Sequence, residues 1–478
     1  MKNQKAPTRK YPSYKDSGIE WLGEVPAHWE VRRLKDFTES NVSVRIPNQL
    51  TENDLIEFVP MTNVNEELGI ITNYNFVPLK EVISGYTKFK NGDIIFAKIT
   101  PCMENGNCAI VSGLKYNIGF GSTEFMIFRS SQRLTKKYLH YFLHNALFRK
   151  NAEPFMKGSA GQKRITSLYM TTHCFALPPI PEQIAIANYL DTHTAKIDKK
   201  IELLTKKATL YANLKQSLIN ETVTRGLSVV STHITRVRAG SEPAPTSQQE
   251  PAPTSAATKA TLSSKGNTTP KMKDSGIEWI GEIPEHWEVK RVKDLFNERN
   301  EKGFPEEIIL IASQDRGVVA KASYERNSMT VQKDFHLMKL VKKNDYVISL
   351  RSFEGGIEIA HQQGIISAAY TVLYSINNEM TNYYKHLFKS KKFILLLVTL
   401  TTGIRDGRNI NYQELKRDFL PLPPLHEQAA IADYLDNKTK SIEQIIEKIH
   451  LQIEKLKELR KALVNDVVTG KIRVADNG

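Results

Sequence analysis

Two long stretches of the chain carry apolar residues at the spacing of an amphipathic helix. The first set steps by four and three positions and consists of Ile197, Ile201, Leu204, Ala208, Tyr211 and Leu218. The second set has the same spacing and consists of Ile442, Ile446, Ile449, Ile453, Leu456 and Leu463. Lys and Glu lie between these positions, as in coiled coils. We predict helices over residues 182–223 and 427–467, each roughly 60 Å long.

An isolated helix of this kind would leave its apolar stripe in water. Packing the two helices against each other covers both stripes within one chain. An antiparallel pair would relate the two halves by a pseudo-two-fold axis, with one domain at each end. Pairing between two chains is the alternative, and the sequence leaves it open. Gly226 and Gly470, with the threonines shortly before them, are the expected helix ends.

Elsewhere, short apolar runs alternate with Gly, Asn and Asp, as in strands joined by turns. These runs are GDIIFAKI, FMIFRS, DYVISL and AYTVLYSI. Helical segments lie between them, over Lys136–Lys150 and Asn382–Val398. The pattern predicts α+β domains with a twisted, mainly antiparallel sheet.

Two blocks of sequence occur twice, in the same order. DSGIEWLGEVPAHWEVRRLKD from Asp16 and its copy from Asp274 share 16 of 21 residues, at an offset of 258. LPPIPEQIAIANYLD from Leu177 and its copy from Leu422 share 11 of 15, at an offset of 245. We call them the opening block and the closing block. Each half is therefore an insert enclosed by two repeated blocks.

The inserts resemble each other only in outline. NGDIIFAKI in the first lies where NDYVISLRS lies in the second, and Gly158 corresponds to Gly403. Between the halves, residues 241–270 are rich in Pro, Ala, Ser and Thr and contain EPAPTS twice, which is typical of a flexible linker. We predict a first domain over 1–180, a helix over 181–226, a linker over 227–272, a second domain over 273–424 and a helix over 425–470.

Composition limits the class of protein. The 478 residues carry a formal net charge of +14, and 40% are hydrophobic. A basic balance suits a polyanionic partner, most often nucleic acid. No apolar run is long enough to span a bilayer, and no apolar segment follows the basic N-terminus, so we expect a cytoplasmic protein. The three cysteines, Cys102, Cys108 and Cys174, favour neither a disulfide framework nor a zinc site.

The sequence lacks the motifs of the relevant enzymes. A methyltransferase motif requires Asn or Asp before its two prolines, and LPPI and LPPL have Leu there. No P-loop is present. The sequence Glu288-Val289-Lys290 resembles part of a nuclease site, but it belongs to the repeated opening block. His28 and His286 also lie in that block, so we interpret them as packing residues rather than general bases.

Paired variable inserts, each closed by LPPxxEQxxIAxYLD and a long helix, closely resemble the specificity subunit of type I restriction–modification enzymes. The WxGE[VI]PxHWE motif of each opening block is also common in that family. The resemblance implies two target-recognition domains, related by a pseudo-two-fold and separated by two long antiparallel coiled-coil helices. It implies a non-catalytic reader of a bipartite double-stranded DNA site that docks two methyltransferase subunits. S-adenosylmethionine, ATP and Mg would then belong to the methyltransferase and nuclease/translocase partners, with no cofactor in this chain.

Within that interpretation, the matched glycine-rich loops and strand ends of the inserts are the candidate DNA contacts. The candidates are Lys98, Gln162, Lys163, Arg164, Arg351, Arg405, Arg408 and Asn409. The candidates for helix packing and methyltransferase docking are Ile197, Ile201, Leu204, Ile442, Ile446 and Ile449. Two alternatives stay open: a coiled-coil scaffold that binds only protein, and the specificity subunit of a differently organised modification system.

Overall fold

A computed structural model describes residues 10–40, 42, 44–159, 161–239, 270–324, 334–377, 381–402 and 409–474. The side chains of residues 228–239, 381, 402 and 409 lie outside this description, as does most of the expected linker. The chain divides into two compact units. Unit 1 comprises Met1–Thr205 and His450–Gly478, and unit 2 comprises Lys206–Ile449.

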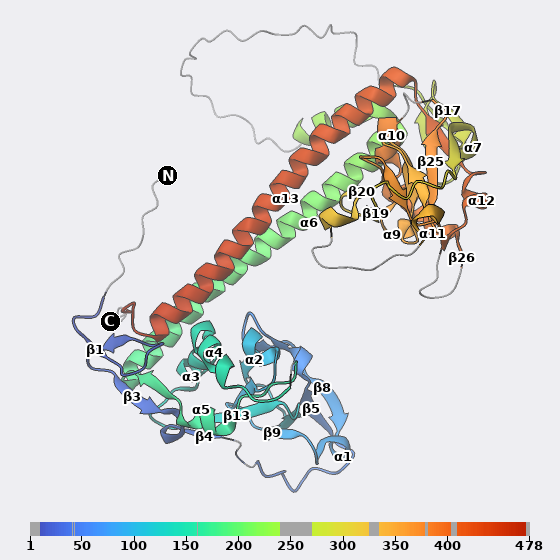
Figure 1. Ribbon diagram of the computed structural model, residues 1–478. Coiled ribbons are helices and arrows are strands. Elements are labelled where there is room, and N and C mark those ends of the chain that lie inside the picture. Colours follow the sequence, from blue (N-terminus) through green and yellow to red (C-terminus); the bar gives the residue numbers. More distant parts are fainter. Residues whose placement is uncertain are drawn as a thin grey trace, which may run out of the picture. The chain divides into compact units, whose positions relative to one another are not determined.

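Each unit contains the beginning of one long helix and the end of the other. The helices are α6 (Ile180–Ala239) and α13 (Leu425–Val468). In unit 1, Arg460 Nε donates to Asp198 Oδ1 at 2.9 Å, and in unit 2, Lys215 Nζ donates to Glu443 Oε1 at 2.5 Å. The helices therefore lie side by side and antiparallel in each unit (Figure 1). The repeat offset of 245 converts one ion pair into the other, and the prediction of antiparallel pairing within one chain is confirmed.

Both expected helix ends contain a glycine with a positive φ angle. Gly226 (φ 76°, ψ 175°) interrupts α6, and the chain is helical again up to Ala239. Gly470 (φ 77°) follows α13. A Cβ atom on Gly470 would lie 2.4 Å from Pro26 Cδ, whereas one on Gly226 would lie 3.3 Å from Trp287 Cζ2. Each helix end thus packs on the opening block of the other half of the sequence.

The opening and closing blocks pair with each other as strands. β3 (Glu30–Arg33) is antiparallel to β14 (Cys174–Leu177), and β17 (Glu288–Arg291) is antiparallel to β28 (Phe419–Leu422). Each opening block also forms a hairpin. These hairpins are β1 (Tyr14–Asp16) with β2 (Glu24–Pro26), and β15 (Met272–Asp274) with β16 (Glu282–Pro284).

The two inserts share a four-stranded antiparallel sheet of the same order. In unit 1 the order is β11 (Cys108–Ile110), β10 (Ile94–Ala97), β13 (Phe125–Ser130) and β4 (Thr38–Ser40). In unit 2 it is β23 (Glu358–Ile359), β22 (Tyr346–Ile348), β25 (Thr371–Ser375) and β18 (Phe296–Arg299). A buried aspartate, Asp93 or Asp345, precedes the second strand in these orders and binds an arginine of the same sheet, Arg129 on β13 or Arg299 on β18.

A second layer of strands differs more between the inserts. In unit 1 it is β8 (Asn75–Pro78), β5 (Leu55–Val59), β12 (Gly119–Gly121) and β9 (Thr87–Phe89), with β5 parallel to β12. In unit 2 it consists of two separate pairs, β19 (Leu310–Ser313) with β20 (Gly317–Ala320), and β21 (Lys339–Val341) with β24 (Gly364–Ile366). The predicted α+β class with a mainly antiparallel sheet is confirmed.

The two expected insert helices are each broken in the middle. α3 (Lys136–His144) and α4 (Ala146–Ala152) meet at Asn145, and α10 (Thr381–Leu387) and α11 (Lys391–Thr399) flank Ser390. Both residues are extended and accept a backbone N–H of the following helix through their side chains. An N-cap in this conformation interrupts the helix, so the prediction of one continuous segment was wrong in each insert.

The remaining elements are short. Unit 1 adds η1 (Leu34–Asp36), η2 (Met61–Asn63), β6 (Val64–Asn65), β7 (Ile70–Ile71), α1 (Leu79–Val82), α2 (Cys102–Asn105), η3 (Glu153–Phe155) and α5 (Ser167–Thr172). Unit 2 adds α7 (Val292–Leu295), α8 (Lys321–Tyr324), η4 (Phe335–Leu337), α9 (Ser352–Gly355), β26 (Thr401–Thr402), β27 (Asn409–Ile410) and α12 (Tyr412–Leu415).

Candidate nucleic-acid interface

The unit 1 candidates lie in two adjacent segments. Lys98 directly follows β10, and its carbonyl accepts the backbone N–H of Ile165 at 2.9 Å. Thr100 N donates to Lys163 O at 2.9 Å. The glycine-rich loop is therefore held against the end of β10, and Lys98, Gln162, Lys163 and Arg164 form one cluster.

Within this cluster the side chains differ in availability. Arg164 binds Glu124 with two hydrogen bonds, of 2.9 and 2.8 Å, and this contact lowers the pKa of the Glu124 carboxyl. The side chains of Gln162 and Lys163 are exposed. Because its guanidinium is already held by a carboxylate, Arg164 fixes the loop, and Gln162 and Lys163 are the better candidates for DNA contact.

Gly158 explains the tight path of the loop. Its φ angle is +136°, and a Cβ atom there would lie 2.6 Å from the Gln162 carbonyl oxygen. Only glycine fits this close approach without strain.

The unit 2 candidates are described only in part. Arg351 is exposed and is the N-cap residue of α9, three residues beyond the end of β22. Arg405 and Arg408 lie outside the described residues. Asn409 pairs with Thr402 through the backbone of β27 and β26, and nothing is described of its side chain.

A cavity of 480 Å³ lies beside Arg351, and we call it the unit 2 notch. Its lining residues are Ala312, Ser313, Gln314, Asp315, Ser349, Leu350, Arg351, Glu354 and Tyr370. Gln314 and Asp315 belong to the turn between β19 and β20, and sequence analysis missed them. The sequence did contain a turn signal, because the polar segment QDRG follows the apolar run IILIAS. In the structure, Gly317 of this segment has a φ of 73°.

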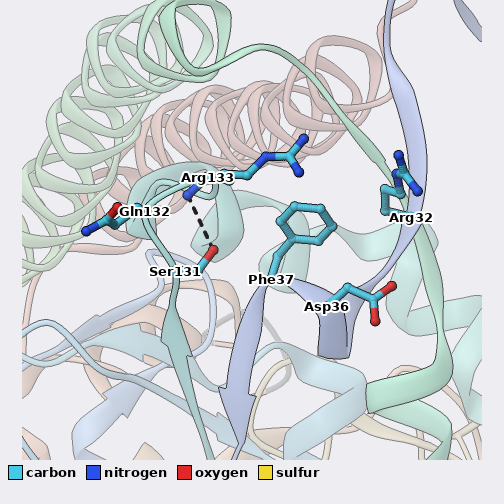
Figure 2. Close-up of a pocket in the computed structure, with 6 residues that line it drawn as sticks. All are labelled: Arg32, Asp36, Phe37, Ser131, Gln132 and Arg133. Atoms are coloured by element: carbon cyan, nitrogen blue, oxygen red, sulfur yellow. Dashed lines mark hydrogen bonds between the residues drawn. The ribbon is translucent and has the colours of Figure 1, made fainter.

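Another polar cavity, of 600 Å³, lies at the opposite end of the unit 1 sheet. Figure 2 shows Arg32 and Arg133 on either side of Phe37, with Ser131 just after β13. The Arg133 guanidinium carbon is 5.1 Å from the centre of the Phe37 ring, and both arginines pair with Glu30. The hydrogen bond from Arg32 lowers the pKa of Glu30. These contacts join β3 to the insert and place this cavity away from the candidate loops.

The histidines of the opening blocks are packing residues. His28 Nε2 and Trp29 Nε1 lie 2.8 and 3.0 Å from Glu182 Oε2, in the closing block. In unit 2, His286 and Trp287 contact Glu427 in the same way, at 2.5 and 3.0 Å. Each carboxylate thus holds an opening block on the first turn of a long helix, which supports the structural interpretation of both histidines.

The last aspartate of each closing block attaches the long helix to its insert. Asp191 accepts from Lys137 and from Tyr141, at 2.5 and 2.7 Å. Asp436 accepts from Lys385 and lies 2.8 Å from His386 Nε2. The hydrogen bond from His386, together with that from Lys385, lowers the pKa of Asp436 to about 2.

The predicted helix-packing residues are all at least partly buried. Ile442 and Ile449 are buried. The others are partly buried, namely Ile197, Ile201, Leu204 and Ile446. Their role in docking a methyltransferase stays a prediction.

Unit 1 also contains buried histidines between the insert and the long helices. A cavity of 1180 Å³ there is lined in part by His140, His144 and Arg149. Burial lowers the pKa of His144 to about 3, and nearby His140 adds to this shift. Burial likewise lowers the pKa of His173 to about 4. These imidazoles are therefore neutral at pH 7.

A family profile described as "Type I restriction modification DNA specificity domain" matches the chain twice, over residues 26–206 and 284–455. Together the two matches cover well over half of the chain. The chain belongs to the type I restriction–modification specificity subunits. The match to each half agrees with the repeated blocks and confirms the family suggested by the sequence.

Curated relatives support this assignment. The EcoAI and EcoEI specificity subunits of Escherichia coli are 38% and 34% identical over 161 and 164 residues, in each case 34% of this chain and 27% of the relative. The chain thus spans about a quarter of these two relatives. The putative MjaX specificity subunit of Methanocaldococcus jannaschii is 26% identical over 476 residues, 95% of this chain and 96% of the relative.

A chain in a solved structure of a type I restriction–modification system has the same fold. Its TM-score is 0.57 at 17% identity, over 93% of this specificity subunit and 98% of the solved chain. Specificity subunits are the non-catalytic DNA-recognition components of these systems. Within the described residues, no group of His, Cys, Asp and Glu could hold a metal ion, and no helix is both long and apolar enough to cross a membrane.

Proposed function

We propose that this specificity subunit reads a bipartite site in double-stranded DNA, one half-site with each unit. One observation carries the proposal. Both units keep the same paired blocks and the same four-stranded sheet order. They nevertheless present different polar side chains near the end of the strand that precedes a short helix, β10 before α2 in unit 1 and β22 before α9 in unit 2. In unit 1 these are Gln162 and Lys163, and in unit 2 they are Arg351 and Gln314. A constant frame with variable donors and acceptors suits two readers of different sequences.

We infer that the antiparallel helices act as a spacer between the two readers, so that a constant number of base pairs is left unread between the half-sites. We expect this chain to dock two methyltransferase subunits and nuclease/translocase subunits, as membership of the family implies. S-adenosylmethionine, ATP and Mg would bind to those partner subunits. The net charge of +14 favours association with the DNA backbone.

The proposal is tested by selection from a random duplex library with the purified methyltransferase complex of the full chain. We expect a particle with two methyltransferase subunits per specificity subunit. The selected DNA should contain two short fixed sequences separated by a constant spacer. An intact complex that enriches no sequence would instead indicate a scaffold that binds only protein.

A further inference from the structure

We propose that the unit 2 notch is a base-reading site, in which Gln314 recognises an adenine and Asp315 accepts from the amino group of an adjacent base. This inference rests on the proposed function and assigns two residues of unit 2 to the reading of its half-site. Neither residue belongs to a repeated block.

The turn that carries both residues is closed by the pairing of Ser313 with Gly317 and lies beside Lys389. The Gln314 carbonyl accepts from Lys389 Nζ at 3.3 Å, and the same ammonium donates to Gly355 O at 2.9 Å. Lys389 also pairs with Glu358, whose side chain is 3% exposed. One ammonium thus ties the turn to the end of α9 and to β23. Base recognition requires side chains that are held in a defined position, and a turn supported in this way provides one.

The amide nitrogen of Gln314 makes two long contacts. Its Nε2 lies 3.4 Å from Arg351 O and 3.3 Å from Glu354 Oε2, and both distances are long for hydrogen bonds. The amide can therefore turn to a base at little cost. A glutamine amide matches the N6 donor and N7 acceptor of adenine in the major groove.

The charge of the notch favours a base edge over the DNA backbone. The carboxylates of Asp315 and Glu354 both line it and would repel a phosphate. Asp315 is exposed; its Oδ1 accepts from the Ser313 hydroxyl and its Oδ2 lies 3.7 Å from Arg316 Nε, and the remaining lone pairs of the carboxylate can receive an amino hydrogen from cytosine or adenine. Arg351, also exposed at this cavity, supplies the positive charge that keeps DNA close.

Unit 1 has a different arrangement at the matched position. The parallel neighbours Phe58–Phe120 in unit 1 and Ile309–Ile365 in unit 2 hold equivalent places in the second layer, at offsets of 251 and 245. Asn63 lies five residues after Phe58, and Gln314 lies five residues after Ile309. Asn63 is therefore the unit 1 counterpart of Gln314. The Asn63 amide donates to Asn73 O and Asn75 Oδ1, both at 3.1 Å, so it is tied into its own domain. We therefore expect the notch to affect one half-site only.

The experiment repeats the selection with Gln314→Ala and with Asp315→Asn in the full chain bound to its methyltransferase. We expect Gln314→Ala to relax preference at one A·T pair by about tenfold, the size of one bidentate contact, and to leave the other half-site unchanged. Asp315→Asn should relax an adjacent position. Lys343→Ala is the matched control, because this exposed lysine precedes β22 at the opposite end of the strand.

The outcomes separate this inference from the proposed function. If the wild-type complex selects no bipartite site, the proposed function fails first. If it selects one, and both variants select the same site with the same strength, the notch does not read DNA. Relaxation at a G·C pair by Gln314→Ala also overturns the adenine assignment. If Gln314→Ala lowers the melting temperature, the isosteric Asp315→Asn variant decides the question.

Discussion

At the scale of residues, the two glutamates of the closing blocks explain why the opening blocks are repeated. Glu182 holds His28 and Trp29, and Tyr11 also donates to it. The sequence indicated that the histidines pack rather than catalyse, because they recur with their tryptophans. It could not show the partner, because 154 positions separate His28 from Glu182.

Removing this carboxylate should destabilise unit 1. Glu182→Ala leaves the indole N–H of the fully buried Trp29 without an acceptor, so we expect a loss of about 3 kcal/mol. Denaturant unfolding of the full chain measures it. Glu20→Ala, at an exposed glutamate of the opening block that contains Trp29, is the control and should change stability by less than about 0.5 kcal/mol. Equal effects of the two substitutions would contradict the proposed role of Glu182.

The buried histidines of unit 1 predict a loss of stability in acid. An unfolded histidine binds a proton near pH 6.5, whereas folded His173 does so only near pH 4. The free energy of unfolding is therefore unaffected by the protonation of His173 above pH 6.5. It decreases as the pH drops from 6.5 to 4, by at most about 1.4 kcal/mol per pH unit for each such histidine.

Unfolding free energies at pH 7.5 and pH 5 test this expectation. His173→Phe should lose less stability between the two pH values than the wild-type chain. His450→Gln, at an exposed position on α13, should show the wild-type difference. A wild-type pH dependence in His173→Phe would show that His173 does not titrate in this way.

At the scale of elements, the long helices were predicted well because their apolar spacing persists over many turns. The breaks at Asn145 and Ser390 were missed, since neither residue interrupts the apolar pattern around it. The notch was missed for another reason. It joins a turn at Gln314 to a strand end at Arg351, and no local pattern reports contacts between distant segments.

The two helix ion pairs, equivalent by sequence, should contribute unequally. Asp198 and Arg460 are 25% and 12% exposed, whereas Glu443 and Lys215 are 58% and 32% exposed. Solvent screens the second pair more strongly. Double-mutant cycles with alanine should give a coupling of about 1 kcal/mol for Asp198–Arg460 and less than about 0.5 kcal/mol for Lys215–Glu443. The reverse order would argue against this register.

At the scale of the whole molecule, a segment near the start of the described chain meets one near its end. The Tyr14 hydroxyl donates to Gly470 O at 3.3 Å, so the first and last described segments of unit 1 are in contact. The sequence predicted the repeated plan of the halves. It could not show that each unit is completed by the end of the other half's helix.

A circular permutant should therefore keep both fold and specificity. Joining Gly478 to Met1 and opening the chain after Ser255, within the expected linker, retains both opening blocks and both helices. We expect a melting temperature close to that of the wild type and the same selected DNA sequence. A permutant that fails to bind the methyltransferase would show that the native order of the halves is needed.

The central claim is that each unit reads its own half of one DNA site. Genome-wide mapping of adenine methylation tests it most directly, with this chain and its methyltransferase expressed in a host without other adenine methylation. We predict one motif with two short fixed parts, a constant unread spacer and one methylated adenine on each strand. Lys163→Ala should alter only one part, and Gln314→Ala only the other. A methylated motif without a spacer, or no motif from an intact complex, would contradict the account.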